Sequence, residues 1–241
     1  MQDGSAQRLF QGQIKYYSRR DQSAGISPII PLFLEWAKKR QFKSKINIAE
    51  FGGSSGLLLS KILAKYPRAN FFNIELIKDY NQEQINKKIQ FIEGSVLKPP
   101  FKDRYFDCII IRDVLHHLVG KNLTETKYNQ IKALKEIRRI LKFNGLVLVE
   151  ELTNNSKIAS SIIYYISKIN SRIGLNIKSL QITTNTVISL LTPEELILIV
   201  QKIFGHEKII KKSYLPSKNN RNIRLVHLGT KSGKIILAIK K

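Results

Sequence analysis

The sequence has few of the features that mark secreted or membrane-spanning proteins. Its 241 residues include a single cysteine, Cys108, so no disulfide can form within the chain and no oxidising compartment is needed. The amino-terminal residues lack the apolar core of a signal peptide. The longest mostly apolar stretch, IASSIIYYISKI, is far shorter than the roughly 20 residues that cross a bilayer. By elimination, we expect a cytoplasmic protein without a transmembrane segment.

Acidic residues are also scarce. The chain has 18 Asp and Glu against 41 Lys and Arg, which gives a formal net charge of +23. Such an excess is compatible with a nucleic acid or an anionic surface as partner, or with an acidic substrate. It is equally compatible with compositional drift, because most of the excess is lysine scattered along a chain that is also rich in isoleucine and asparagine. Both interpretations stay open.

Short apolar runs alternate with longer amphipathic segments along most of the chain. The amphipathic segments include residues 57–66 and 128–142, and the second is expected to bury Leu134 and Ile137 on one face. Asn144 and Gly145 then supply a left-handed stop before the next strand. The alternation predicts an α/β fold with a parallel sheet covered by helices on both faces. The expected strands are INIAEF, FFNIEL, IQFIEG, DCIIIR, LVLVEEL, HEKIIKKSYL and GKIILAIKK.

The alternation of short apolar runs and amphipathic segments ends after Leu152. The next 40 or so residues, long for a connecting loop, place isoleucines at positions 158, 162, 166 and 169 on one helical face. With that face, the helix would either cover a bound hydrophobic ligand or pack into the core as an ordinary helix. A new helix then starts at LTPEEL, where Thr192 caps, Pro193 fits the first turn and Glu195 completes a capping box.

A loop of small residues follows the first expected strand, where open parallel sheets bind ligands. Its glycines, Gly52, Gly53 and Gly56, match neither the dinucleotide fingerprint nor a Walker phosphate loop. Glu50, just before the loop, would repel a phosphate but suits an ammonium group. Glu75 ends the second strand about 20 residues beyond the loop, where an acid accepts hydrogen bonds from ribose hydroxyls. We therefore expect a pocket for a ribose and a cation without phosphate.

These segments resemble a known family over roughly residues 45–150, as well as at LTPEEL. The segments AEFGGSSG, NIEL, IEGSVLKPPF and YFDCIIIRDVLHHL are similar to motifs of the class I S-adenosylmethionine-dependent methyltransferases that act on small molecules. The resemblance implies a Rossmann-like, doubly wound, mostly parallel seven-stranded sheet with an antiparallel last strand and a helical lid insertion. It divides a single domain into cover helices (1–44), a cofactor-binding core (45–152), the lid (153–191) and a closing helix with strands (192–241).

The resemblance also assigns site residues. Ser54 stands where the family has its middle loop glycine, and the substitution requires that Ser54 avoid the most glycine-dependent backbone angles. Ser95 stands where an acid usually receives the adenine amino group. The residues implied to bind S-adenosyl-L-methionine are Glu50, Phe51, Gly52, Gly53, Ser54, Gly56, Glu75, Leu76, Gly94, Ser95, Val96 and Arg112.

For catalysis, a base for the acceptor proton is the main chemical requirement beyond positioning. His116 is the first candidate because its ordinary pKa is near neutral pH, Asp113 is the second, and Glu150 or Glu151 is the third. Each has a structural alternative: Asp113 as a helix cap or an amine ligand, and His116 with His117 as partners of backbone groups. We predict no metal site.

Three functions remain open at this stage. The leading one is methyl transfer to a small, partly apolar acceptor by a monomer or homodimer. The second is methyl transfer to RNA or another nucleic acid, although no Asn/Asp-Pro-Pro-Tyr-like segment follows the fourth strand, where RDVLHH stands instead. The third is a non-catalytic module that binds a partner through its basic carboxyl-terminal tail.

Overall fold

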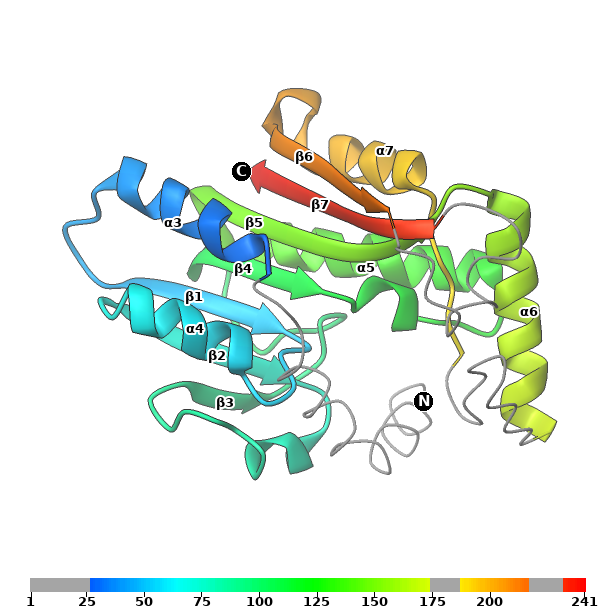
Figure 1. The fold of residues 1–241 in the computed structure, drawn as a ribbon, viewed down its shortest axis with the longest axis horizontal. Helices are drawn as coiled ribbons and strands as arrows, with labels where there is room; N and C mark the ends of the chain where they lie inside the picture. The colour runs from blue at the N-terminus through cyan, green and yellow to red at the C-terminus, as the bar shows by residue number, and fades with distance from the viewer. Residues whose placement is uncertain (1–26, 174–186, 217–231) are drawn as a thin grey trace.

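In a computed structural model of the chain, the described residues are 27–173, 187–216 and 232–241. They contain one seven-stranded sheet with the strand order β3-β2-β1-β4-β5-β7-β6 (Figure 1). The strands are β1 (Ile46–Phe51), β2 (Ala69–Glu75), β3 (Gln90–Glu93), β4 (Phe106–Arg112), β5 (Leu141–Asn154), β6 (Ile209–Pro216) and β7 (Ser232–Lys240).

The direction of the strands confirms the predicted fold class. Strands β3, β2, β1, β4 and β5 pair in parallel, whereas β7 is antiparallel to both β5 and β6. The last strand therefore enters the sheet between β5 and β6, and β6 forms the edge. Lys211 and Lys212 are exposed on that edge strand, as expected for a sheet edge that stays in contact with water.

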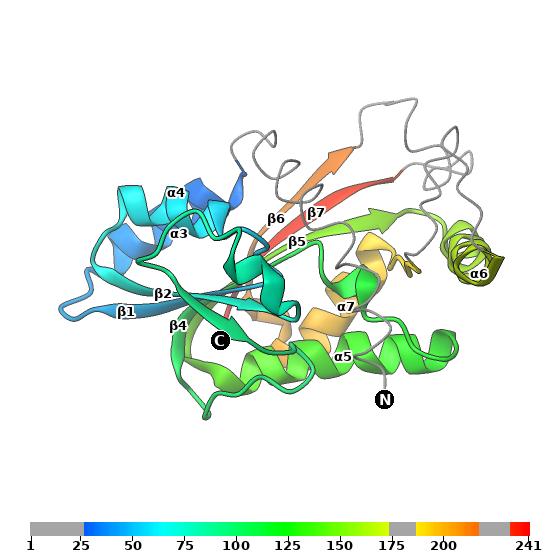
Figure 2. The same cartoon turned by 90° about the horizontal axis from the view of Figure 1, so that it is seen from below.

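Helices cover both faces of the sheet, as the alternating pattern predicts (Figures 1 and 2). One face carries α3 (Ile29–Arg40) and α4 (Leu57–Lys65), and the other carries α5 (Leu123–Ile140) and α7 (Pro193–Phe204). Both views place α6 (Lys157–Ile173) beyond the carboxyl ends of the parallel strands. Three short 3₁₀ helices are also described: η1 (Lys78–Asn81), η2 (Leu115–His117) and η4 (His206–Lys208).

The central strand β4 shows why its sequence is continuously apolar. Cys108 and Ile110 face the layer of α3 and α4, whereas Ile109 and Ile111 face the layer of α5 and α7. Successive side chains of a strand point to opposite faces. A strand covered on both faces therefore needs apolar residues at every position, and the alternation of polar residues is lost.

The ends of the helices follow the local signals in part. Thr192 and Glu195 form the predicted capping box of α7. Helix α5 starts earlier than expected, because the Asn122 side chain accepts a hydrogen bond from the amide of Glu125 at 2.8 Å and caps the helix there. Asn144 is left-handed, with a φ of 59°. It lies within β5 and not at the helix end, since α5 already stops at Ile140.

Of the two roles expected for the isoleucine face of the insertion after β5, packing as a core helix is wrong. The isoleucines at 158, 162 and 169 are exposed, and the one at 166 is only partly buried, so this face is not a core face. Helix α6 instead buries the opposite side, which mixes apolar and polar side chains: Ala159, Ser160, Ile163, Tyr164, Ser167 and Asn170. Hydrophobic periodicity locates an apolar stripe but does not say whether the protein or another surface covers it.

The predicted cover helices lie only partly within the described residues. Of the predicted cover helices in 1–44, α3 is present, and residues 1–26 lie outside the described part of the chain. Helix α3 packs Phe33 and Trp36 into the core layer that it shares with α4. Within the described ranges, no helix combines the length and the apolar character that crossing a membrane requires.

Candidate functional site

Carboxylates collect along the carboxyl edge of the parallel strands. Each lies in the last residues of its strand or directly after it, so the parallel order brings them to one edge of the sheet. In the register, Glu150 of β5 is the neighbour of Arg112 at the end of β4. The residues of this acidic edge are Glu50, Glu75, Asp113, Glu150 and Glu151.

The loop of small residues between β1 and α4 turns through left-handed backbone. Gly52 and Gly56 have φ values of 69° and 70°, which glycine adopts at little cost. Ser54 also has a positive φ, of 50°, so it does not avoid the left-handed region. It occupies the small part of that region that residues with a Cβ can reach. Serine is therefore a tolerable replacement for glycine at this position.

Gly53 is required for a different reason, namely space. A Cβ on Gly53 would lie 2.3 Å from Oδ1 of Asn73 and 3.1 Å from the carboxylate of Glu50. Asn73 is fully buried in β2, and its amide donates a 2.9 Å hydrogen bond to the carbonyl oxygen of Ser54. Because Asn73 holds the loop against the sheet, a side chain at residue 53 would push the two apart.

Glu75 holds the other side of the same loop. Its two carboxylate oxygens accept hydrogen bonds from the amide of Ser54, at 3.0 Å, and from that of Leu76, at 2.9 Å. Glu75 thereby connects the loop after β1 to the residue that follows β2. Phe51, in contrast, points into the core and is 1% exposed. Only its backbone is available for the binding role that the sequence assigned to it.

The predicted adenine segment follows β3. The amide of Gly94 donates to the carbonyl of Glu75 at 2.9 Å, which fixes this segment beside the end of β2. The Ser95 hydroxyl accepts from the amide of Leu97 at 3.2 Å, so it partly serves its own turn. Val96 is buried in the core layer of α5 and α7. The site roles of these residues stay predictions.

Arg112 and Glu50 are close neighbours beneath the loop. Nε of Arg112 lies 3.7 Å from Oε1 of Glu50, whose side chain is completely buried. A buried carboxylate of this kind needs a cation nearby, and Arg112 supplies one. A ligand ammonium group in the expected contact with Glu50 would therefore share this carboxylate with the guanidinium group of Arg112.

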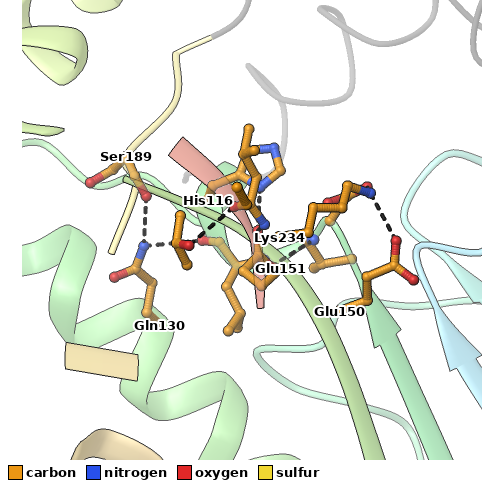
Figure 3. Close-up of polar contacts among 12 residues, drawn as sticks. His116, Gln130, Glu150, Glu151, Ser189 and Lys234 are labelled. Atoms are coloured by element: carbon orange, nitrogen blue, oxygen red, sulfur yellow. Dashed lines mark hydrogen bonds and ion pairs between the residues drawn. The ribbon is translucent and has the colours of Figure 1, made fainter. Parts of the chain in front are cut away.

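A lysine of β7 joins two residues of the acidic edge (Figure 3). Nζ of Lys234 lies 2.5 Å from Asp113 and 2.9 Å from Glu150, and the other oxygen of Glu150 accepts from the Ser27 hydroxyl at 2.9 Å. Asp113 also has a left-handed backbone, with a φ of 54°, an angle that aspartate adopts more readily than most residues. The sequence analysis did not identify Lys234. Its only signal was a lysine within an otherwise apolar closing strand.

The charges around Lys234 shift its pKa and that of Asp113 in opposite directions. Burial favours the neutral form of Asp113, but Lys234, His116 and Arg112 outweigh it and hold the pKa of Asp113 below its ordinary 3.8. Burial likewise opposes the charge of Lys234, whereas Asp113 and Glu150 raise the pKa of this lysine above 10.5. Both groups are therefore charged at neutral pH.

His116 lies in η2, the short 3₁₀ helix that follows β4. It is buried, and its Nδ1 atom contacts Oε1 of Glu151 in a short hydrogen bond (Figure 3). Oε2 of Glu151 accepts from the amides of Val114 and Leu115, at 3.2 and 2.8 Å. Burial would lower the pKa of His116, but the charge and the hydrogen bond of Glu151 raise it above 6.5. Glu151 thus fixes both the orientation and the charge of the ring.

Gln130 of α5 ties the turn of His116 to the segment that precedes α7. Its amide donates to the carbonyls of Leu115 and Ser189, at 3.2 and 3.1 Å, and the amide of Ser189 donates to the carbonyl of His116 at 2.9 Å (Figure 3). The sequence analysis missed both Gln130 and Ser189. A buried glutamine on an amphipathic helix was the only available signal.

Three groups of this network have the spacing of a metal-ligand set. Ligand atoms of Asp113, His116 and Glu151 lie within 4.8 Å of one another. However, the ammonium group of Lys234 already neutralises Asp113, and Glu151 is engaged with His116 and two backbone amides. We interpret the cluster as a network of ion pairs and hydrogen bonds, and the absence of a metal stays a prediction.

Comparison with known proteins finds a family match that includes three residues of this edge, Glu50, Glu75 and Asp113. Residues 49–149 match the family model described as "Methyltransferase domain". An uncharacterized protein of Methanocaldococcus jannaschii is 31% identical over 102 residues, which cover 38% of this chain and 40% of that protein. O-methyltransferase 7 of Dictyostelium discoideum is 24% identical over 113 residues, which cover 46% of this chain and 32% of that protein. The matches thus span less than half the length of these curated relatives.

Solved structures share the fold over nearly the whole chain. A SAM-dependent methyltransferase from Methanosarcina mazei superposes with a TM-score of 0.62 at 15% sequence identity, covering 90% of this chain and 99% of the other. Identity at this level supports a common fold and says nothing of a common substrate. The seven-stranded sheet with its antiparallel strand β7 is the architecture of these neighbours.

Proposed function

We propose that the chain, of which residues 49–149 match the model of a methyltransferase domain, binds S-adenosyl-L-methionine and transfers its methyl group to a small acceptor. The observation that carries this proposal is the acidic edge. In a chain of net charge +23, the ligand-binding edge of the sheet is lined by carboxylates. Such an edge favours a ligand that carries positive charge and disfavours phosphate.

The residues of the edge fit this cofactor in chemistry. Glu75, at the end of β2, would accept hydrogen bonds from the ribose hydroxyls. Gly53 lets the loop lie close against Asn73 and Glu50, because a Cβ there would meet both side chains. Arg112 and Asp113, at the end of β4, would hold the carboxylate and the ammonium group of the methionine part. Ser95 and the backbone of Val96 would contact the adenine.

When bound, the cofactor supplies a methyl group on a sulfonium, which is already a good leaving group. The chain then has to orient the acceptor and remove its proton. We assign the removal of this proton to His116. Glu151 accepts a hydrogen bond from Nδ1 of His116, which leaves Nε2 as the basic atom of the neutral ring. Asp113 is a weaker candidate, since its charge is already paired with Lys234. The helical insertion containing α6 would close over the acceptor.

Isothermal titration calorimetry of the purified chain tests the proposal. We expect binding of S-adenosylmethionine and S-adenosylhomocysteine, and no binding of NAD or ATP. Replacing Glu75 with glutamine should weaken binding by at least about tenfold, since a hydrogen bond to a charged acceptor contributes roughly 1.5–3 kcal/mol. Glu93→Gln is the matched control, because Glu93 is the exposed neighbour of Glu75 in the parallel register of β3.

Two results would contradict the proposal. One is uptake of NAD or ATP with no affinity for either form of the methyl donor. The other is equal affinity of the Glu75→Gln and Glu93→Gln variants for the methyl donor, which would show that Glu75 of the acidic edge does not contribute to cofactor binding. A steep dependence of RNA binding on salt, together with methylation of RNA, would favour the nucleic-acid alternative.

A further inference from the structure

Helix α6 carries a stripe of large apolar side chains that face away from the protein. The stripe consists of Ile158, Ile162, Tyr165, Ile169 and Ile173, which are between 44% and 75% exposed. Their spacing of three or four residues puts them on one side of the helix. Soluble proteins rarely leave such a continuous apolar surface uncovered, and where they do it usually marks a contact with another surface.

Positive charge flanks this α6 stripe. The helix contains Lys157, Lys168 and Arg172 and neither aspartate nor glutamate. At 100° per residue, these three cations fall on the same side of the stripe. Lys157 is 3.8 Å from Glu195 of α7, which makes it an exposed and weak pair. An apolar face bordered by lysine and arginine is the pattern of a helix that lies in the plane of an anionic membrane surface.

Tyr164 on the buried side of α6 and Lys168 on its flank fix the helix to the turn region of the candidate site. The hydroxyl of Tyr164 donates to the carbonyl of Gly120 at 3.1 Å, and the ammonium group of Lys168 donates to the carbonyl of Lys121 in a short hydrogen bond. Both carbonyls belong to the segment that follows η2 and His116. These contacts hold the helix next to the carboxyl edge of the sheet (Figures 1 and 2), while the side chains of its stripe are exposed.

We propose that the α6 stripe is a docking surface for an anionic lipid bilayer. Charge complementarity selects this occupant over a second copy of the chain. Pairing two copies through α6 would bring like-charged flanks together in a chain of net charge +23. It also selects the bilayer over a nucleic acid, because nucleic-acid surfaces are polar and offer nothing to cover exposed isoleucine side chains. The inference does not depend on the proposed methyl transfer.

Vesicle co-sedimentation of the full chain tests the docking surface. We expect binding to vesicles of phosphatidylcholine mixed with phosphatidylserine, and little binding to phosphatidylcholine alone. The double variant Ile158→Ser with Ile169→Ser should lower the partition coefficient by about tenfold or more, because it removes apolar area from the bilayer contact. Leu198→Ser with Ile210→Ser is the matched control, since both are similarly exposed apolar residues outside α6. It should bind as the wild type does.

Every other outcome overturns the proposal. If the stripe variant binds as tightly as the wild type, the general charge of the chain and not α6 is responsible. If the wild type sediments as a dimer and the stripe variant as a monomer, the occupant is a second copy. If the stripe variant loses thermal stability relative to the control variant, the stripe packs within the chain. If neutral and anionic vesicles bind alike, the cationic flank plays no part.

Discussion

His116 and Glu151, which are 35 positions apart in the sequence, share a buried hydrogen bond at the carboxyl edge of the sheet. Glu151 is itself held by the amides of Val114 and Leu115, so the carboxylate cannot turn away from the ring without losing both contacts. The pair therefore acts as one unit in which the carboxylate sets the tautomer of the imidazole and its proton affinity. The unit joins β5 to the turn after β4.

The first prediction concerns the titration of this pair. Replacing Glu151 with glutamine should lower the pKa of His116, because the variant loses the negative charge that outweighs burial. NMR titration of the histidine ring protons measures this, with the His116→Gln spectrum used for assignment. A His116 pKa that is unchanged in the Glu151→Gln variant would show that the carboxylate does not control the ring.

The raised pKa of His116 also determines how the stability of the folded chain changes with pH. Because the folded state raises the pKa of His116 above 6.5, the stabilisation by the protonated ring is fully present below pH 6.5. It is lost as the pH rises through the raised pKa. The difference in melting temperature between the wild type and His116→Gln should therefore shrink as the pH increases. If His116 is the base, methyl transfer should rise over the same range.

The second prediction concerns the space at Gly53. Alanine at this position should lower the free energy of unfolding by about 1–3 kcal/mol and weaken cofactor binding, because its Cβ would displace Asn73. Urea denaturation measures the first effect and calorimetry the second. In an Asn73→Ala background, the obstructing side chain is gone, so Gly53→Ala should cost much less. If Gly53→Ala lowers the free energy of unfolding equally in both backgrounds, contact with the Asn73 side chain is not the cause of the destabilisation.

The third prediction concerns the cation that joins two acids. Lys234→Met keeps the aliphatic stem but leaves Asp113 and Glu150 close together without the ammonium group. We expect a loss of about 1–3 kcal/mol in the free energy of unfolding, since the remaining acids are partly buried and lose a partner. Lys240→Met, on the same strand, is the control. Adding Asp113→Asn to Lys234→Met should recover part of the loss, and no recovery would contradict the role assigned to Lys234.

The sequence by itself determined the order of most elements, the fold class and the positions of the loops that follow β1 and β4. These features depend on local signals, such as the continuous apolar run of β4 or the capping box of Thr192 and Glu195, which operate within a few residues. It also predicted that the glycine loop and the turn after β4 lie at one edge of the sheet, because the carboxyl ends of parallel strands meet there.

The tertiary structure alone decided which of these groups meet. Lys234 reaches Asp113 only because β7 enters the sheet beside β5, and no local pattern encodes that position. The clash of a Gly53 side chain with Asn73, the pairing of His116 with Glu151 and the outward direction of the α6 stripe have the same origin. Each depends on contacts between segments far apart in the chain, and their distances are set by packing and not by sequence spacing.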